Sequence, residues 1–261
     1  VAGLGKTDAH SFAAARGLMT TDKTAKQLAF SFELGDYTCK IGTIMKGGKR
    51  VCPQMATTIC LLTTDVAIAP TTLQKALRQA TNATLNLLNK DGVASPNDFI
   101  CIMASGEAGN YIISNEDSEY QKFCFILTEA LKRVCRMLIA DGESSVAECL
   151  VSGAKSAKSA RDVAKAVAKA EEVRSALRLH TVDVQSLLYC IYTAGYAFRL
   201  DKIEISILGG EEKFVLYSQG RRQYLLPETA EKIFQNQTVT LCLGLGEGNY
   251  SACSTFCFDE E

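Results

Sequence analysis

Residues 45–65, MKGGKRVCPQMATTICLLTTD, place a lysine and a threonine at a spacing that could support covalent chemistry. Lys46 stands ahead of a glycine pair and a Pro-Gln-Met-Ala-Thr turn, and the turn leads directly into an apolar, β-branched run. The hydroxyl of Thr57 could act as a nucleophile, but a threonine hydroxyl reacts poorly at neutral pH and needs a base beside it. A free α-amine on the same residue would supply that base. The competing interpretation is structural, because threonine commonly begins strands.

The elements that would position residues 45–65 are strands and helices predicted on both sides of them in the sequence. Residues 27–34 and 37–45 alternate as two strands joined by Gly35-Asp36, which favours a hairpin. The run 58–66 reads as a buried strand, and leucines recur at helical spacing after Pro70. The same patterns predict strands at 99–104, 203–208, 213–217 and 238–243, and helices at 118–141, 156–178 and 228–234.

This order of elements predicts an α/β (α+β) fold with layered mixed β-sheets and flanking helices. We expect residues 1–155, which include the Met-Ala-Thr turn, to form a nucleophile-bearing domain. Residues 156–261 would form a C-terminal α/β domain, packed with the first as one unit.

Composition and charge exclude several function classes. Lys and Arg total 28 against 29 for Asp and Glu, and the chain lacks a basic block, so nucleic acid is not an expected partner. An apolar stretch long enough to span a bilayer and a signal-peptide pattern are both missing from the sequence. The eleven cysteines sit mostly in apolar runs, which predicts free thiols in a reducing compartment, either cytoplasm or the matrix of a mitochondrion or plastid. Because the chain opens with Val1, we expect that a leader or upstream segment has been removed.

Residues 46–57 resemble a specific family signature. They are similar to the Lys-Gly-Ser-Gly-Met and Ala-Pro-Asn-Met-Ala-Thr motifs of the ornithine acetyltransferase (glutamate N-acetyltransferase) family, and they align without a gap. In that family the precursor cuts itself between the Ala and Thr of the motif, and the new amino-terminal Thr is the nucleophile. The matching bond is Ala56-Thr57. The resemblance covers most of the chain and implies an ornithine acetyltransferase-like fold.

The resemblance also implies roles for individual residues. Thr57 would carry the acetyl group, Lys46 would bind a substrate carboxylate, and Thr20 and Thr21 would line the pocket. Glu143, which follows Asp141-Gly142 as in the family's Asp-Gly-Glu-Gly-Ala, would contact substrate and assist proton transfer. Acetyl transfer from N-acetylornithine to glutamate, a step of arginine biosynthesis, would follow ping-pong kinetics without a cofactor or metal. Self-association is expected by analogy.

Several segments depart from the family pattern. The Asp-Pro-Asn-Trp-Gly-Arg loop is replaced by residues 181–186, TVDVQS, and residues 144–147 read SSVA instead of Gly-Ala-Thr-Lys. Val93 stands where the family has Asp, and Lys49 replaces a glycine. The family's Thr-Gly pair, which stabilises the oxyanion of the tetrahedral intermediate, falls before the first residue given, and its substrate-binding Asn and Thr fall after the last.

Two interpretations therefore stay open. The chain is either an acetyltransferase with an amino-terminal threonine nucleophile, or a catalytically inactive homologue that serves as a structural or assembly subunit of a larger complex. The match runs through the acetyltransferase signature, which disfavours a third class, an aminopeptidase built on a related self-cleaving fold. Cleavage at Ala56-Thr57 distinguishes the first two, because an intact chain leaves Thr57 without its amine base.

Overall fold

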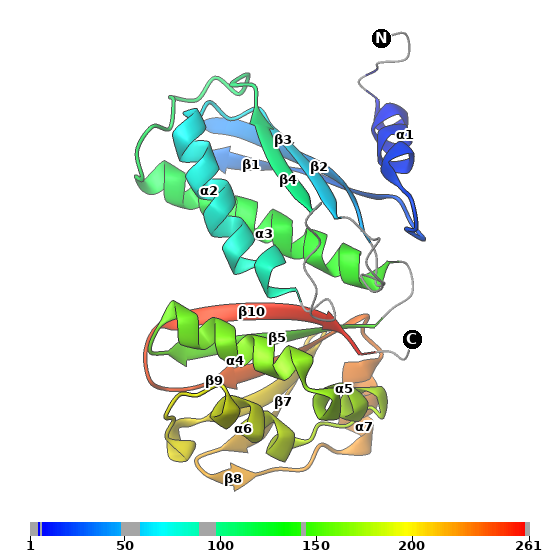
Figure 1. Ribbon diagram of the computed structural model, residues 1–261, viewed down its shortest axis with the longest axis vertical. Helices are drawn as coiled ribbons and strands as arrows, with labels where there is room; N and C mark the ends of the chain where they lie inside the picture. The colour runs from blue at the N-terminus through cyan, green and yellow to red at the C-terminus, as the bar shows by residue number, and fades with distance from the viewer. Residues whose placement is uncertain (1–4, 6, 48–57, 89–97, 142–144, 259–261) are drawn as a thin grey trace. The chain divides into compact units, whose positions relative to one another are not determined.

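The computed structural model describes residues 5, 7–47, 58–88, 98–141 and 145–258 (Figure 1). The chain divides into two compact units, the first made of Val1–Asn86 and Gly92–Gly142 and the second of Leu87–Asp91 and Glu143–Glu261. Strand β5 (Val146–Ala154) falls before the domain boundary expected after residue 155, but it lies in the second unit. The reason is its pairing, since both of its neighbouring strands come from the end of the chain.

The first unit is built on a four-stranded sheet in the order β1-β2-β3-β4. β1 and β2 form an antiparallel hairpin, β3 runs antiparallel to β2, and β4 runs parallel to β3. The predicted hairpin is confirmed, because Leu34 pairs with Tyr37 across a two-residue loop. Gly35 takes a φ of 56°, a left-handed conformation that favours glycine. The strands are β1 (Lys26–Leu34), β2 (Tyr37–Lys46), β3 (Ile59–Thr64) and β4 (Phe99–Ala104).

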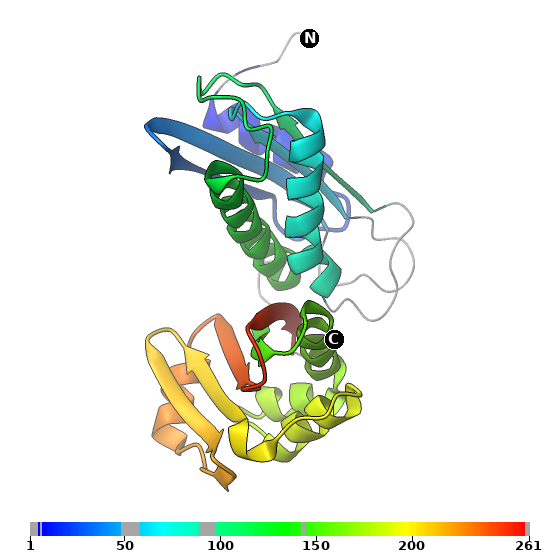
Figure 2. The ribbon, with the colours of Figure 1, turned by 90° about the vertical axis from the view of Figure 1, so that its left-hand side faces the viewer.

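Helices α2 (Pro70–Ala83) and α3 (Ser118–Ala140) pack against each other and lie on the same side of this sheet (Figures 1 and 2). α3 begins where the Asp117 side chain accepts a hydrogen bond from the Tyr120 amide, an N-cap. Its apolar face is buried and consists of Phe123, Leu127, Leu131, Val134 and Leu138. α1 (Asp8–Leu18), which the sequence patterns did not predict, packs against β1 and β2, and a short 3-10 turn spans Leu85–Leu87.

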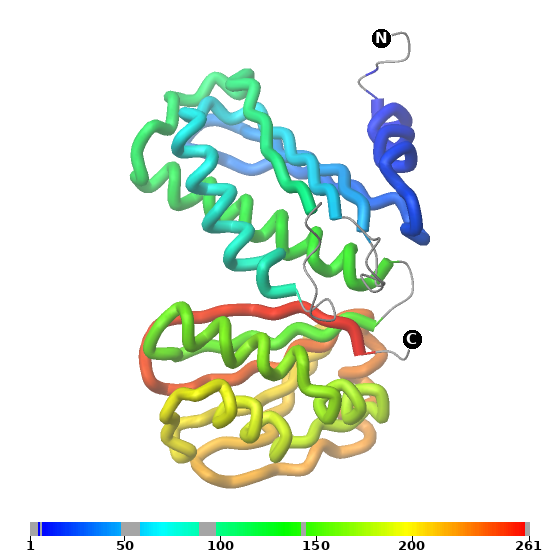
Figure 3. Tube along the Cα trace, viewed as in Figure 1, coloured from blue at the N-terminus to red at the C-terminus, as the bar shows by residue number. Residues whose placement is uncertain are grey.

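The second unit is built on a six-stranded sheet in the order β10-β5-β9-β6-β7-β8. β5 runs parallel to β9 and antiparallel to β10, so strands distant in the sequence lie side by side (Figure 3). The sequence patterns missed both β5 and β10, because small and polar residues interrupt the apolar alternation of each strand. The further strands are β6 (Glu204–Gly209), β7 (Glu212–Ser218), β8 (Arg221–Arg222), β9 (Thr238–Gly244) and β10 (Tyr250–Cys257).

The helix predicted over 156–178 is two helices, α4 (Ala157–Lys169) and α5 (Glu171–Arg178). Ala170 between them has extended backbone, with φ −72° and ψ 117°, and it ends one helix and starts the next. The change of direction lets α4 pack on β5 and β10 while Val173 and Leu177 of α5 also reach the core. The remaining elements of this unit are α6 (Val184–Thr193), the 3-10 turn Leu200–Lys202 and α7 (Pro227–Phe234).

Mixed sheets flanked by helices confirm the predicted fold class. Within the described part of the chain, the helices are all too short or too polar to cross a bilayer. The cysteines that the structure describes are free, and six of them are buried.

Candidate active site

Two of the predicted substrate-binding residues meet in the first unit. Lys46 is the last residue of β2, and Thr20 lies in the segment between α1 and β1. The Nζ of Lys46 donates a hydrogen bond of 3.2 Å to Oγ1 of Thr20. Thr21, next to it, is exposed, and Lys46 is half-buried. An ammonium and a hydroxyl are thus presented together at the end of a strand, a combination that can bind a carboxylate.

The residue after Thr57 packs beside the same strand end. Gly47 has a φ of 136°, and a Cβ placed there would lie 3.3 Å from Oγ1 of Thr58. The amide of Thr58 donates a 2.7 Å hydrogen bond to Oδ1 of Asp98, just ahead of β4. Thr58 is therefore held between β2 and β4. Ala56, Thr57 and Glu143 lie outside the described residues, so their roles stay predictions.

Asp22 connects these pieces. One of its oxygens accepts hydrogen bonds from the Gly47 amide at 2.6 Å and from the Nζ of Lys26 at 2.9 Å. Its other oxygen accepts from the Thr20 amide at 3.2 Å. Burial by itself would raise the pKa of Asp22, but the hydrogen bonds from Gly47, Lys26 and Thr20 outweigh it and lower the pKa below the ordinary value of 3.8. The carboxylate is therefore ionised at neutral pH.

Lys26 links Asp22 to Asp141. Its side chain is only 1% exposed, and its three protons have three acceptors: Asp22, Oδ1 of Asp141 at 2.6 Å, and the carbonyl of Thr24 at 3.2 Å. Asp141 ends α3 in a left-handed conformation, with φ 33°, and its carboxylate also accepts the amide of Lys23. Two buried carboxylates thus share one ammonium.

The sequence-based reading did not single out Lys26 and Asp141 as functional. The sequence predicts a helix that ends at residue 141 and a strand that begins at residue 27, and it indicates no contact for the side chain of Asp141 or Lys26. A signal for Lys26 was present, because it occupies an inward position of the alternating strand, on the face of Leu28 and Phe30. A lysine on the buried face of a strand requires partners. The distant partner was not readable from the sequence.

The segment that departs from the family's polar loop has a structural role in the second unit. The Asp183 side chain accepts hydrogen bonds from the amides of Gln185 and Ser186, so it is the N-cap of α6. Thr181 bonds back to the carbonyl of Ala176 through both its amide and its hydroxyl. Residues 181–183 therefore belong to the connection between α5 and α6, and residues 184–186 begin α6.

Comparison with known proteins identifies the family. The model of the ArgJ family matches residues 2–258. The chain belongs to the ArgJ family. The resemblance seen in residues 46–57 is thereby confirmed.

Curated ArgJ proteins resemble this chain over most of its length. The arginine biosynthesis bifunctional protein ArgJ of Symbiobacterium thermophilum is 36% identical over 194 residues, which cover 74% of this chain and 48% of that protein. The protein of the same name, ArgJ 1, from Clostridium acetobutylicum is 28% identical over 256 residues, 97% of this chain and 62% of that protein. The chain therefore spans about half to three fifths of the length of these relatives.

A solved ArgJ structure supports the fold. The crystal structure of the arginine biosynthesis bifunctional protein ArgJ from Bacillus halodurans matches with a TM-score of 0.66 and 26% identity. The match covers 76% of this chain and 92% of that chain. The ArgJ fold predicted from the motif is confirmed.

Proposed function

We propose that this chain transfers an acetyl group from N-acetylornithine to glutamate through an acetyl ester on Thr57. The observation that carries the proposal is that the Thr20–Asp22 turn, the end of β2 and the residue after Thr57 meet at one end of the first sheet. Lys46 ends β2 and Gly47 follows it, Thr58 precedes β3, and the Thr20–Asp22 turn bonds to both Lys46 and Gly47. This convergence supports the proposal, because Lys46 pairs with Ile59, two residues after Thr57.

The reaction has two balanced halves. Oγ of Thr57 attacks the acetyl carbonyl of N-acetylornithine, the C–N bond breaks, and the departing ornithine amine takes up the hydroxyl proton through the α-amine of Thr57. The amine of glutamate then attacks the ester carbonyl, and the C–O bond to Thr57 breaks. The proton that the glutamate amine loses passes through the α-amine to Oγ of Thr57 and restores the hydroxyl. Each half passes through an oxyanion that needs hydrogen-bond donors.

In this proposal Lys46 and Thr20 bind the substrate. The Lys46 ammonium would pair with the substrate carboxylate, and the Thr20 hydroxyl, which already accepts from Lys46, would orient that ammonium. Glu143 would contact substrate and handle the proton. Thr21 would line the same pocket.

The proposal is tested by the intact mass of the purified protein under denaturing conditions. Self-processing gives two fragments split before Thr57 in place of one species of 28.3 kDa. The Thr57→Ala variant is the control and stays whole. A split wild type is then assayed for transfer from acetylornithine to glutamate. One uncut wild-type chain without transfer activity contradicts the proposal.

The second candidate is an inactive ArgJ homologue that serves as a structural subunit. The observation that favours it is the capped start of α6, since residues 181–186 support a helix where the family has a polar functional loop. An uncut chain that co-purifies with a defined partner protein supports this role. A processed chain with transfer activity excludes it.

Further expectations accompany either role. We infer a reducing compartment, cytoplasm or organelle matrix, because the described cysteines are free. The expected packing of the two domains as one unit and the expected self-association remain proposals. Light scattering that gives a monomer counts against self-association.

A further inference from the structure

Lys26 joins segments of the first unit that lie far apart in the sequence. Asp22 belongs to the turn that carries Thr20 and Thr21, and Asp141 ends α3 two residues before Glu143. We propose that Lys26 is a positioning residue of the candidate active site: through Asp22 and Asp141 it sets the pocket-lining turn against the end of α3. Its role in acetyl transfer rests on the function proposed above.

The contacts form a continuous chain across the site. Lys26 donates to Asp22 at 2.9 Å and to Asp141 at 2.6 Å, and Asp22 in turn accepts the Gly47 amide at 2.6 Å. The amide of Lys23 adds a second tie to Asp141. A displacement of the end of α3 would therefore weaken the hydrogen bond between Asp22 and the amide of Gly47, the residue next to Lys46. One ammonium with three directed bonds can hold this arrangement, whereas an apolar side chain could only fill the space.

The cluster is better explained by positioning than by stability. A buried ion pair pays a desolvation penalty that can exceed its attraction, and well-packed apolar residues of similar volume are often at least as stable. Here two carboxylates share one ammonium, and the excess negative charge is compensated by the amides of Thr20, Lys23 and Gly47. Those three amides therefore report on whether the cluster is intact.

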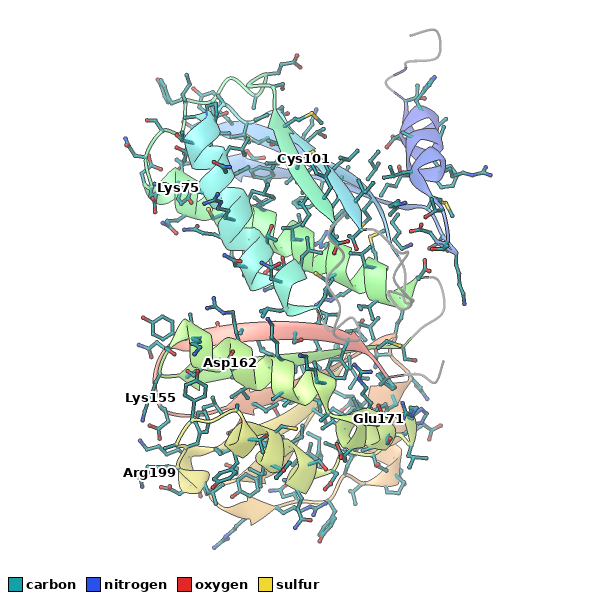
Figure 4. The ribbon with its side chains drawn as sticks, in the orientation of Figure 1. Lys75, Cys101, Lys155, Asp162, Glu171 and Arg199 are labelled. Carbon is teal, nitrogen blue, oxygen red and sulfur yellow. The ribbon has the colours of Figure 1, made fainter. Side chains whose placement is uncertain are left out.

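Hydrogen exchange of these amides tests the proposal without any need for catalysis. In Lys26→Met we expect the amides of Thr20, Lys23 and Gly47 to exchange with solvent roughly tenfold faster or more. Without the ammonium, Asp22 and Asp141 no longer hold their positions, and the hydrogen bonds from these amides to the two carboxylates weaken. Lys75→Met is the matched control, because Lys75 on α2 bonds to Glu116 at 2.9 Å but is 62% exposed (Figure 4). Wild-type exchange at all three amides in a folded Lys26→Met protein would overturn the proposal.

A milder variant tests the connection itself. Asp141→Asn keeps the size of the side chain and removes one charge, and it serves if Lys26→Met does not fold. We expect faster exchange at Gly47 as well as at Lys23, although the Gly47 amide bonds to Asp22 and not to Asp141. A change confined to Lys23 would show that Lys26 does not connect the two carboxylates, and the proposal fails.

Kinetics separate this proposal from the function on which it rests. In a wild type that cleaves and transfers acetyl, we expect Lys26→Met to lower kcat/KM roughly a hundredfold, as small misplacements can do, with a raised KM. Lys26→Arg, which keeps the charge, should recover part of the loss, and Lys75→Met should lose nothing. An unchanged kcat/KM in Lys26→Met contradicts positioning. A wild type that neither cleaves nor transfers contradicts the function instead, and the exchange experiment still decides whether Lys26 fixes the turn.

Discussion

The Nζ of Lys26 lies 2.6 Å from Oδ1 of Asp141, although the two residues are 115 positions apart. Their side chains are 1% and 7% exposed, so water contributes little to the solvation of either charge. Asp22, at 2% exposure, completes the cluster. A buried charge that loses its partner is costly, which makes the cluster sensitive to single substitutions.

Replacement of Lys26 by Met should destabilise the protein by about 3–5 kcal/mol, because two buried carboxylates lose their common ammonium. Urea denaturation followed by circular dichroism measures the change in the free energy of unfolding. Lys75→Met removes an exposed lysine and its ion pair with Glu116 and should cost about 1 kcal/mol or less. Equal losses in the two variants would show that the Lys26 cluster contributes no more than a surface pair.

The stability of the wild type should fall as the pH drops through the region below 4. The folded state lowers the pKa of Asp22 from 3.8, so the stabilisation is complete above that value and is lost as the pH falls through the lower, folded pKa. Asp22→Asn removes the titrating group and should flatten this part of the curve of unfolding free energy against pH. Parallel curves for the wild type and Asp22→Asn would contradict the assigned shift.

Substitution of Gly47 by Ala should destabilise the protein by about 3 kcal/mol or more. Two costs add up: alanine has an unfavourable φ at this position, and its Cβ crowds neighbouring side chains. Its φ is 136°, and the new Cβ would lie 3.1 Å from Cδ2 of Leu138 and 3.3 Å from Oγ1 of Thr58. Gly35→Ala is the matched control, because its φ is also positive but a Cβ there meets nothing within 4 Å. It should cost about 1–2 kcal/mol. Thermal melts of both variants distinguish crowding at the site from backbone strain alone.

Lys46→Met should raise the KM for the carboxylate-bearing substrate about tenfold to a hundredfold, the range for a lost hydrogen bond to a charged group. The value of kcat should change much less, since the contact is made to a part of the substrate that does not react. Steady-state kinetics of the processed protein measure both. Lys40→Met, at an exposed position of the same strand, should leave both unchanged. A fall in kcat at unchanged KM would assign Lys46 to the chemical step.

Elements with strong local patterns were predicted well. The β1-β2 hairpin follows from alternation around Gly35-Asp36, and α3 follows from its apolar stripe and its end at Asp141. β5 and β10 lack a clear local signal because small and polar residues interrupt their apolar alternation. The pattern over residues 156–178 predicts one helix because nothing local distinguishes Ala170 from its helical neighbours. The break between α4 and α5 at Ala170 lets both helices pack against the core, and the position of the core is a tertiary property.

The sequence by itself determined the ArgJ family and the candidate residues of the 46–57 motif, because residue types in a gapless register carry that information without coordinates. It also indicated that Lys46 and the Thr20 turn belong to one pocket. Only the tertiary structure decided that Lys26 and Asp141 are partners. Pairing a lysine at the start of a strand with the end of a distant helix depends on how the sheet and helix pack. That packing is set by many weak apolar contacts acting together, and no local pattern encodes it.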